Sequence, residues 1–505
     1  MRHQLNFSLF VVAVVTWAVS ACGGGSEPSI AQTSNVVADA PLPGTTPFVS
    51  FLTLRGAGIG SLSSLRYTIA PKPGHLSKPV SASFSAEYLL RRGYAVLGQQ
   101  KLTLPVVGLY PGYRNDVGLI VTFMDGSTTS LTVPIQAAAY ADPTMVYDSP
   151  HIVTPRVPGK VLGYDFFYMK SYLGPPVVLD TDGEIRWAAP AATVPTSVSS
   201  LFVDEGFSIG SLDSTQVVRL ELDGTSTATS LTTPTFTNFH HTIDPGKFGM
   251  MAGVDATIDG QKEVENVLAE FNAAGVVTGE WDLGAILSSY MKGAGDDPAT
   301  FVWPGVDWFH MNSAVYDPRD DSLVVSSREN FIIDIAYATG EIRWIFGDPE
   351  KYWYTFPSLR AKALAMPDGA FFPIGQHALS INPQGLLMLF NNGQPSSNEP
   401  AGEPEGASRT YSAVSAYSID ATAGTAREVW RFDNGQTLKS PFCSSAYQSS
   451  DGSTLINYAM VNNTTARLVG LDPMRQVVFD FEYPSAPCIV SWNAAPIPFD
   501  DLRFE

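Results

Sequence analysis

The first strongly patterned region covers residues about 47–140, where short apolar and polar positions alternate. Alternation over a few residues is the pattern of strands that bury one face. Pro-Gly and Asp-Gly pairs separate these stretches, and such pairs mark tight turns. The expected strands lie in VSFLTLRG, VSASFSAEYLL, KLTLPVVGLYP, DVGLIVTFMDG and TTSLTVPIQA. The pattern predicts a small N-terminal β-sandwich domain over residues 47–140.

From about residue 150 onward a turn followed by a strand repeats, and the strand often ends in tryptophan. The six copies are LDTDGEIRWAA, ELDGTSTATS, FNAAGVVTGEWDL, IAYATGEIRWIFG, DATAGTAREVWRF and LDPMRQVVFDFEY. Four-stranded blades of about 40–50 residues are typical of β-propellers. We therefore expect an all-β fold in which a six-bladed β-propeller occupies residues 141–505. Loop insertions are expected at 283–305, 348–372 and 393–408, and only ILSSYMKGA, near 286–294, has a helical pattern.

The N-terminus has the pattern of an export signal. A short basic start precedes LFVVAVVTWAV, which is too short for a transmembrane helix of the mature protein. The segment ends in VSAC, which resembles the bacterial lipoprotein signal. We expect a signal peptide at residues 1–21, a lipid on Cys22 and a flexible tether over residues 22–46. This predicts an exported bacterial lipoprotein of the periplasm, anchored to the outer membrane; ordinary cleavage nearby with a free N-terminus is the alternative.

Composition adds two restrictions on function. The chain has 505 residues, of which 45% are hydrophobic and 16% are charged, and its formal net charge is −19. A nucleic-acid-binding protein needs a basic stripe, and the sequence has none. We therefore expect no nucleic-acid partner. Small anionic substrates remain open if the site supplies local positive charge, and a homodimer is one option for the oligomeric state.

Two cysteines remain beyond Cys22, and both lie near the C-terminal end of the chain. Cys443 and Cys488 are candidates for a disulfide, because paired cysteines are common in exported proteins. Two buried thiols are the alternative.

Three histidines recur at nearly constant spacing. The steps from His241 to His310 and from His310 to His377 are 69 and 67 residues, and a further 67 residues lead to Ser444. At three of these four positions a glycine follows eight residues later (Gly249, Gly385 and Gly452). Equivalent positions of a radial repeat meet at one place, so these histidines are expected to share a site at one mouth of the propeller channel.

Arg328 is expected to lie beside His310, because a hairpin at DPRDDS returns the chain to the same end. Three imidazoles and a guanidinium, with few carboxylates nearby, would form an anion site. Binding of zinc is an alternative, but the guanidinium disfavours a dication, and no metal is predicted. A second alternative is that the histidines only stabilise the propeller. We favour transfer of a charged group through a histidine nucleophile.

Two segments then identify a family. WFHMNSAVYDPRDDSLVVSSREN, continuing into IDIAYATGEIRWIFGD, and GQHALSINPQGLLMLFNNG resemble the bacterial aryl-sulfate sulfotransferases, which use no activated nucleotide donor. LPVVGLYPGYRNDVGLIVTF looks like the N-terminal domain of that family. The resemblance implies transfer of a sulfuryl group from a phenolic sulfate ester to a phenol, with ping-pong kinetics, a sulfohistidine and no cofactor.

The resemblance also implies roles for individual residues. His377, in GQHA, would be the nucleophile, and His310 and Arg328 would hold and polarise the sulfuryl oxygens. The glycine spacing makes His241 the third imidazole, whereas His240 would point away from the site.

Two polar residues are further candidates for contact with substrate. Asn312, in HMNS, and Ser444, at the fourth repeat position, would bind the sulfuryl group or the phenol, or would be channel residues without a role in catalysis. The aromatic candidates for stacking on phenolic rings are Trp303, Trp308, Phe309, Tyr316, Phe371 and Phe372.

The first histidine element departs from the family pattern. The usual HHD is His240-His241-Thr242 here, and DPGKFG replaces an Asn-Gly turn. Loss of the aspartate removes a group that would orient an imidazole. The altered element keeps open a non-catalytic lipoprotein whose propeller binds a ligand. A sulfatase-like hydrolase, with water as acceptor, is a second alternative.

Overall fold

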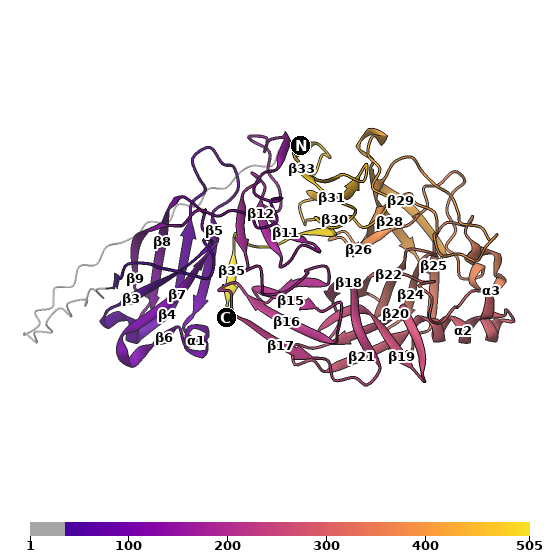
Figure 1. Ribbon diagram of the computed structural model, residues 1–505, viewed down its shortest axis with the longest axis horizontal. Coiled ribbons are helices and arrows are strands. Elements are labelled where there is room, and N and C mark those ends of the chain that lie inside the picture. Colours follow the sequence, from indigo (N-terminus) through magenta and orange to yellow (C-terminus); the bar gives the residue numbers. More distant parts are fainter. Residues whose placement is uncertain (1–35) are drawn as a thin grey trace, which may run out of the picture.

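The computed structural model describes residues 36–505 and shows two β-rich parts (Figure 1). Among these residues, no helix combines the length and the apolar character needed to cross a lipid bilayer. The expected signal peptide, the lipid on Cys22 and most of the expected tether lie outside the described residues. These three features stay predictions.

The N-terminal part is a sandwich of two five-stranded sheets. The first sheet contains β1 (Val37–Ala38), β2 (Leu42–Pro43), β3 (Val49–Arg55), β6 (Ala95–Val96) and β7 (Lys101–Val107). The second sheet contains β4 (Leu62–Ile69), β5 (Val80–Ser85), β8 (Arg114–Phe123), β9 (Thr128–Gln136) and β35 (Leu502–Phe504). Helix α1 (Ala86–Arg91) follows β5, and the hydroxyl of Ser85 caps it by accepting the Tyr88 N–H.

Two expected boundaries are wrong. The strands β1 and β2 lie within the stretch expected to be tether, because both pair with β3 along its exposed edge. At the other end, β35 leaves the propeller part and pairs in parallel with β5. The C-terminus therefore completes the sandwich (Figure 1) and links the two ends of the chain.

The remaining strands form six antiparallel sheets, which follow one another along the chain. The first three sheets contain β11 (Phe166–Lys170), β12 (Val177–Asp180), β13 (Ile185–Ala188) and β34 (Asn493–Pro496); β14 (Ser200–Val203), β15 (Gly206–Gly210), β16 (Gln216–Glu221) and β17 (Ser226–Ser230); and β18 (Phe236–Pro245), β19 (Met250–Ile258), β20 (Gln261–Phe271) and β21 (Val277–Asp282).

The last three sheets complete this part. They contain β22 (Met311–Asp317), β23 (Ser322–Ser327), β24 (Ile332–Ala336) and β25 (Ile342–Phe346); β26 (His377–Ile381), β27 (Leu387–Asn391), β28 (Ala413–Asp420) and β29 (Thr425–Phe432); and β10 (His151–Thr154), β30 (Ser445–Gln448), β31 (Thr454–Val461), β32 (Thr465–Leu471) and β33 (Val477–Pro484).

The arrangement of these sheets is propeller-like. The strands β14, β18, β22, β26, β30 and β34 each begin or end a sheet, and each contacts the next one in this series. The all-β class, with a sandwich before a propeller-like part, is confirmed. The turn–strand repeat of the sequence is the hairpin between the two outer strands of each sheet. A glycine with positive φ stands in five of these turns, for example Gly183 (φ 91°), and Arg475 (φ 63°) takes this place in the sixth.

The insertions carry the helices of this part. The expected helix near 286–294 is confirmed as α2 (Leu283–Ala294), which the Asp282 carboxylate caps and Gly295 ends at φ 96°. The short helix α3 (Pro357–Arg360) lies in the second insertion.

Asp334, on β24, makes stability depend on pH. Burial raises the pKa of its carboxyl to about 7 and outweighs the opposing effect of the nearby Ser322 hydroxyl. An unfolded chain ionises this group near a pKa of about 3.9. The folded state therefore loses stability relative to the unfolded state as pH rises from about 4 to about 7.

We expect Asp334→Asn to raise the thermal unfolding midpoint at pH 8 by on the order of a few degrees and to change it little at pH 4. Calorimetry at both pH values measures this, with the exposed Asp213→Asn as the control. An equal shift at both pH values would show that ionisation of Asp334 is not the cause.

Candidate active site

The three repeat histidines lie where the innermost strands deviate from regular pairing. Register shifts occur between His240 and Ile243 on β18, and between His377 and Ser380 on β26. His310, directly before β22, has φ 53°, and His241 has φ 51°. Side chains normally point to alternate faces of a strand, and a bulge or a residue with left-handed backbone changes the direction of one side chain. Strained backbone of this kind clusters at functional sites.

The three imidazoles converge. The ring centroids of His241 and His310 are 4.8 Å apart, and those of His241 and His377 are 6.5 Å apart. One ring nitrogen from each of the three lies within 4.8 Å of the others. His241 and His377 are buried, and His310 is half-buried. Residues separated by 136 positions in the sequence thus share one site.

A single carboxylate contacts three histidines. Oε1 of Glu265, on β20, lies 2.9 Å from Nδ1 of His240. Oε2 lies 3.1 Å from Nδ1 of His310 and 3.6 Å from Nδ1 of His241. Burial opposes ionisation of this group, but the neighbouring imidazoles outweigh burial and hold the pKa of Glu265 well below its usual value.

His240 belongs to this arrangement, although the sequence suggested that it points away. Its Nε2 lies 2.9 Å from Oδ1 of Asp255, and its ring centroid is 6.3 Å from that of His241. Burial lowers the pKa of His240, but the hydrogen bonds to Asp255 and Glu265 raise it overall to about 10. His240 is therefore a cation at neutral pH that helps to hold Glu265.

The expectation of few carboxylates near the histidines is wrong. Besides Glu265, Oδ2 of Asp307 lies 2.6 Å from Nδ1 of His310. Asn398, in the third insertion, donates a hydrogen bond from Nδ2 to the Asp307 carbonyl oxygen (2.6 Å). With Nδ1 of His310 occupied by carboxylates, its Nε2 is the nitrogen available for chemistry.

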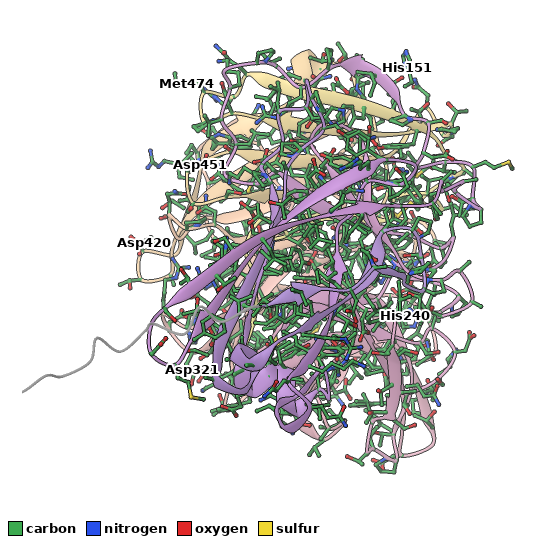
Figure 2. The ribbon with its side chains drawn as sticks, turned by 90° about the vertical axis from the view of Figure 1, so that its left-hand side faces the viewer. His151, His240, Asp321, Asp420, Asp451 and Met474 are labelled. Carbon is green, nitrogen blue, oxygen red and sulfur yellow. A yellow bond between two sulfur atoms is a disulfide. The ribbon has the colours of Figure 1, made fainter. Side chains whose placement is uncertain are left out.

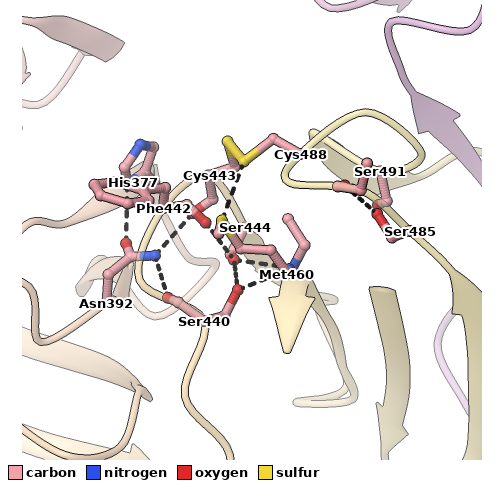
Figure 3. The surroundings of a disulfide bond; sticks show 12 residues. His377, Asn392, Ser440, Phe442, Cys443, Ser444, Met460, Ser485, Cys488 and Ser491 are labelled. Carbon is pink, nitrogen blue, oxygen red and sulfur yellow. Dashed lines mark hydrogen bonds between the residues drawn. A yellow bond between two sulfur atoms is a disulfide. The ribbon is translucent and has the colours of Figure 1, made fainter. Parts of the chain in front are cut away.

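His377 forms a hydrogen bond with Asn392 (Figure 3), and its surroundings fix one tautomer. Its Nδ1 lies 2.9 Å from Oδ1 of Asn392 and 3.1 Å from the Gly375 carbonyl oxygen. The Asn392 amide nitrogen donates to the carbonyl oxygens of Ser440 (2.7 Å) and Cys443 (3.1 Å), which fixes the amide so that its oxygen faces His377. Nδ1 must then carry the proton, and Nε2 keeps its lone pair. Burial and the nearby Arg328 lower the pKa of His377 to about 3.

Arg328 follows β23 and lies beside the histidines. Its backbone N–H donates to the His310 carbonyl oxygen (3.1 Å), and its guanidinium pairs with Glu329. The guanidinium also lies 5.2 Å from the centre of the Phe442 ring. The buried Lys351 fixes this turn by donating to the carbonyl oxygens of Arg328 (3.2 Å) and Glu329 (2.6 Å). The structure thus brings together His241, His310, His377 and Arg328.

The two polar candidates contact the protein itself. Nδ2 of Asn312 donates to the carbonyl oxygen of Gln376 (2.6 Å) and so holds the residue before His377. The Ser444 hydroxyl is 2.9 Å from that of Ser440, and it accepts the Ala459 N–H (3.1 Å). Both side chains position the backbone around the site.

Two aromatic rings that the sequence analysis did not single out lie at the site. Trp308 packs against Phe301 and Phe309 in the core. Instead, Trp492 lies 5.1 Å from the His241 ring, and Phe442 lies beside Arg328. No repeat or motif marks these two residues in the sequence.

A disulfide joins Cys443 to Cys488 (Figure 3). It links the loop that carries Phe442 to the segment that leads to Trp492. The cysteines therefore tie together two segments that reach the site.

The tautomer of His377 can be tested directly. We expect selective ¹⁵N labelling of histidine to show His377 protonated at Nδ1 and unprotonated at Nε2, with no change of form between pH 8 and pH 5, because the pKa is low. Asn392→Leu should mix the two tautomers, whereas Asn392→Asp keeps an acceptor and should preserve the first. If His377 kept a single tautomer, protonated at Nδ1, in Asn392→Leu, this role of Asn392 would be contradicted.

Comparisons with known proteins agree with this architecture. A family model described as Arylsulfotransferase (ASST) matches residues 159–492, and one described as Arylsulfotransferase Ig-like domain matches residues 37–138. An arylsulfate sulfotransferase AssT of Escherichia coli O6:H1 (strain CFT073) is 30% identical over 176 residues, which cover 31% of this chain and 28% of that protein. An AssT of Lelliottia amnigena is 27% identical over 172 residues, covering 30% and 28%. The matched segments thus span less than a third of these relatives.

Solved structures resemble the chain only distantly. A protein of unknown function from Bacteroides thetaiotaomicron VPI-5482 aligns with a TM-score of 0.33 and 11% identity, covering 94% of this chain and 93% of that one. A quinonprotein alcohol dehydrogenase-like protein from the same organism aligns with a TM-score of 0.31 and 7% identity, covering 86% and 91%. The first family model spans well over half of the 505 residues, and the chain therefore belongs to the arylsulfotransferase family.

Proposed function

We propose that this protein transfers a sulfuryl group from a phenolic sulfate ester to a phenolic acceptor, by way of a covalent intermediate on His377. The observation that carries the proposal is the fixed tautomer of His377, which leaves a lone pair on Nε2 beside two further imidazoles and a guanidinium. The family of the chain supports the same class of reaction.

In the first half-reaction, Nε2 of His377 attacks the sulfur atom, and the bond from sulfur to the phenolic oxygen breaks. The electron pair of that bond leaves with the phenolate, which is a good leaving group. Arg328 and the imidazole of His241 lie where they can stabilise the negative charge on the other sulfuryl oxygens. A neutral nucleophile is available over a wide pH range, because the pKa of His377 is low.

In the second half-reaction, the acceptor phenol attacks the sulfur, and the sulfur–nitrogen bond returns its electron pair to His377. Nε2 of His310 takes the proton of the phenol. The carboxylates of Asp307 and Glu265 at Nδ1 stabilise the positive charge that this transfer creates, in the manner of a carboxylate that supports a histidine base. In the next cycle, His310 can return this proton to the departing phenolate.

We expect His377→Ala to lower release of 4-nitrophenol from 4-nitrophenyl sulfate by at least about 10³-fold, because the nucleophile is lost. Mass spectrometry of wild-type protein after a brief reaction with donor alone should find a sulfuryl group on His377. The control is His151→Ala, since His151 is exposed on β10 and lies far from the labelled His240 in Figure 2.

Two results would contradict the proposal. Normal turnover by His377→Ala would exclude this nucleophile. Release of inorganic sulfate at a rate that added phenol does not change, with no aryl sulfate formed from the acceptor, would identify a hydrolase.

A further inference from the structure

We propose that His241, His310 and His377 form a binding site for one divalent transition-metal ion, with Zn²⁺ as the preferred ion, and that this ion competes with the aryl sulfate. The competition rests on the proposed function, whereas the binding does not. Zinc takes imidazole nitrogens at about 2.0–2.1 Å in a tetrahedral arrangement, which sets the nitrogens about 3.3 Å apart. The three nitrogens already lie within 4.8 Å of one another, so small side-chain rotations complete the geometry.

The contacts behind the imidazoles are those of a metal site. Histidines that bind metals usually donate the second ring N–H to a carboxylate or a carbonyl oxygen, which orients the free nitrogen. His310 has Asp307 at Nδ1 (2.6 Å), and His377 has the oxygens of Asn392 and Gly375 at Nδ1. In both residues Nε2 is left for a ligand.

His241 supplies an independent observation. Its side chain is only 5% exposed, and within residues 36–505 neither ring nitrogen has a hydrogen-bond partner. A buried polar group without a partner is costly, and a site of this kind is normally completed by a ligand. The His241 ring is close to three other rings: its centroid is 4.8 Å from that of His310, 5.1 Å from that of Trp492 and 6.5 Å from that of His377.

The charges around the site suit a dication. The sequence suggested that Arg328 would repel a metal, but Glu329 pairs with that guanidinium. His240 is likewise paired with Asp255. The two carboxylates that remain, Glu265 and Asp307, both contact the imidazoles and together carry two negative charges. Glu265 also pairs with His240, but the two cations and four carboxylates together still carry a net charge of −2, which an incoming divalent ion would offset.

The metal ion and the aryl sulfate compete because both need the lone pair on Nε2 of His377. Coordination takes the Nε2 electrons that His377 needs for attack on sulfur, and the bound ion fills the space of the sulfuryl group. A fourth coordination position would stay open to water. The ion is therefore expected to inhibit transfer reversibly.

The test is titration of the full chain, freed of metal with EDTA, with Co²⁺ as a coloured probe. We expect one equivalent of Co²⁺ to produce the visible absorption of a tetrahedral site, and one equivalent of Zn²⁺ to remove it. Asp307→Asn should weaken binding by about 10- to 100-fold, and His241→Ala should weaken it further.

Controls locate the ion. His75→Ala alters another group of metal-ligating residues, made by His75, Asp180 and Asp182. This variant and His151→Ala should bind Co²⁺ like the wild type. Loss of binding in His75→Ala, or unchanged binding in both His241→Ala and Asp307→Asn, would overturn the assignment, as would the absence of a tetrahedral spectrum in the wild type.

The kinetic readout separates the two proposals. Zn²⁺ should raise the KM for 4-nitrophenyl sulfate without lowering kcat, and EDTA should reverse the effect. A KM that does not change at saturating Zn²⁺ would overturn the competition. If the metal-free protein transfers no sulfuryl group at all, the proposed function fails, and the Co²⁺ titration still decides whether the metal site exists.

Discussion

The site depends on the buried carboxylate of Glu265, which contacts the imidazoles of His240, His241 and His310. Imidazoles in a low-dielectric interior lose hydration, and positive charge on one opposes positive charge on the next. A central carboxylate offsets both effects and fixes two rings by their Nδ1 atoms. Nε2 of His310 is then left free near the rings of His241 and His377, and Asn392 fixes the tautomer of His377.

The fold supplies this arrangement because the innermost strands of consecutive sheets lie side by side. The innermost strands β18, β22 and β26 contact one another in order, so residues about 70 positions apart in the sequence become neighbours. The ends of the chain reinforce the ring, since β34 pairs with β11 and β35 joins the sandwich. The disulfide closes a loop of 45 residues and is expected to stabilise the fold by about 4 kcal/mol through the entropy of the unfolded chain.

Sequence patterns predicted the features that repeat. The hairpin between the two outer strands repeats in every sheet of the propeller-like part, with a turn glycine in five of the six. The histidines recur at a nearly constant spacing of their own, so both the architecture and the meeting of His241, His310 and His377 could be inferred. The supporting groups could not. Glu265 stands in the middle of β20 without an equivalent in the other sheets, and Asn392 and Trp492 act through contacts that only the tertiary structure creates. Of the supporting groups, Asp307 gives the clearest signal in the sequence, because it precedes His310 by only three residues.

The most direct test of the central role of Glu265 compares two glutamine substitutions on the same strand. Glu265→Gln removes the shared charge, whereas Glu270→Gln alters a buried carboxylate that instead accepts hydrogen bonds from Phe248 and Tyr337. Rapid-mixing kinetics with 4-nitrophenyl sulfate and phenol should show that Glu265→Gln slows both half-reactions by on the order of 10²-fold and that Glu270→Gln changes them little. Wild-type rates in a folded Glu265→Gln protein would contradict the central role of this carboxylate.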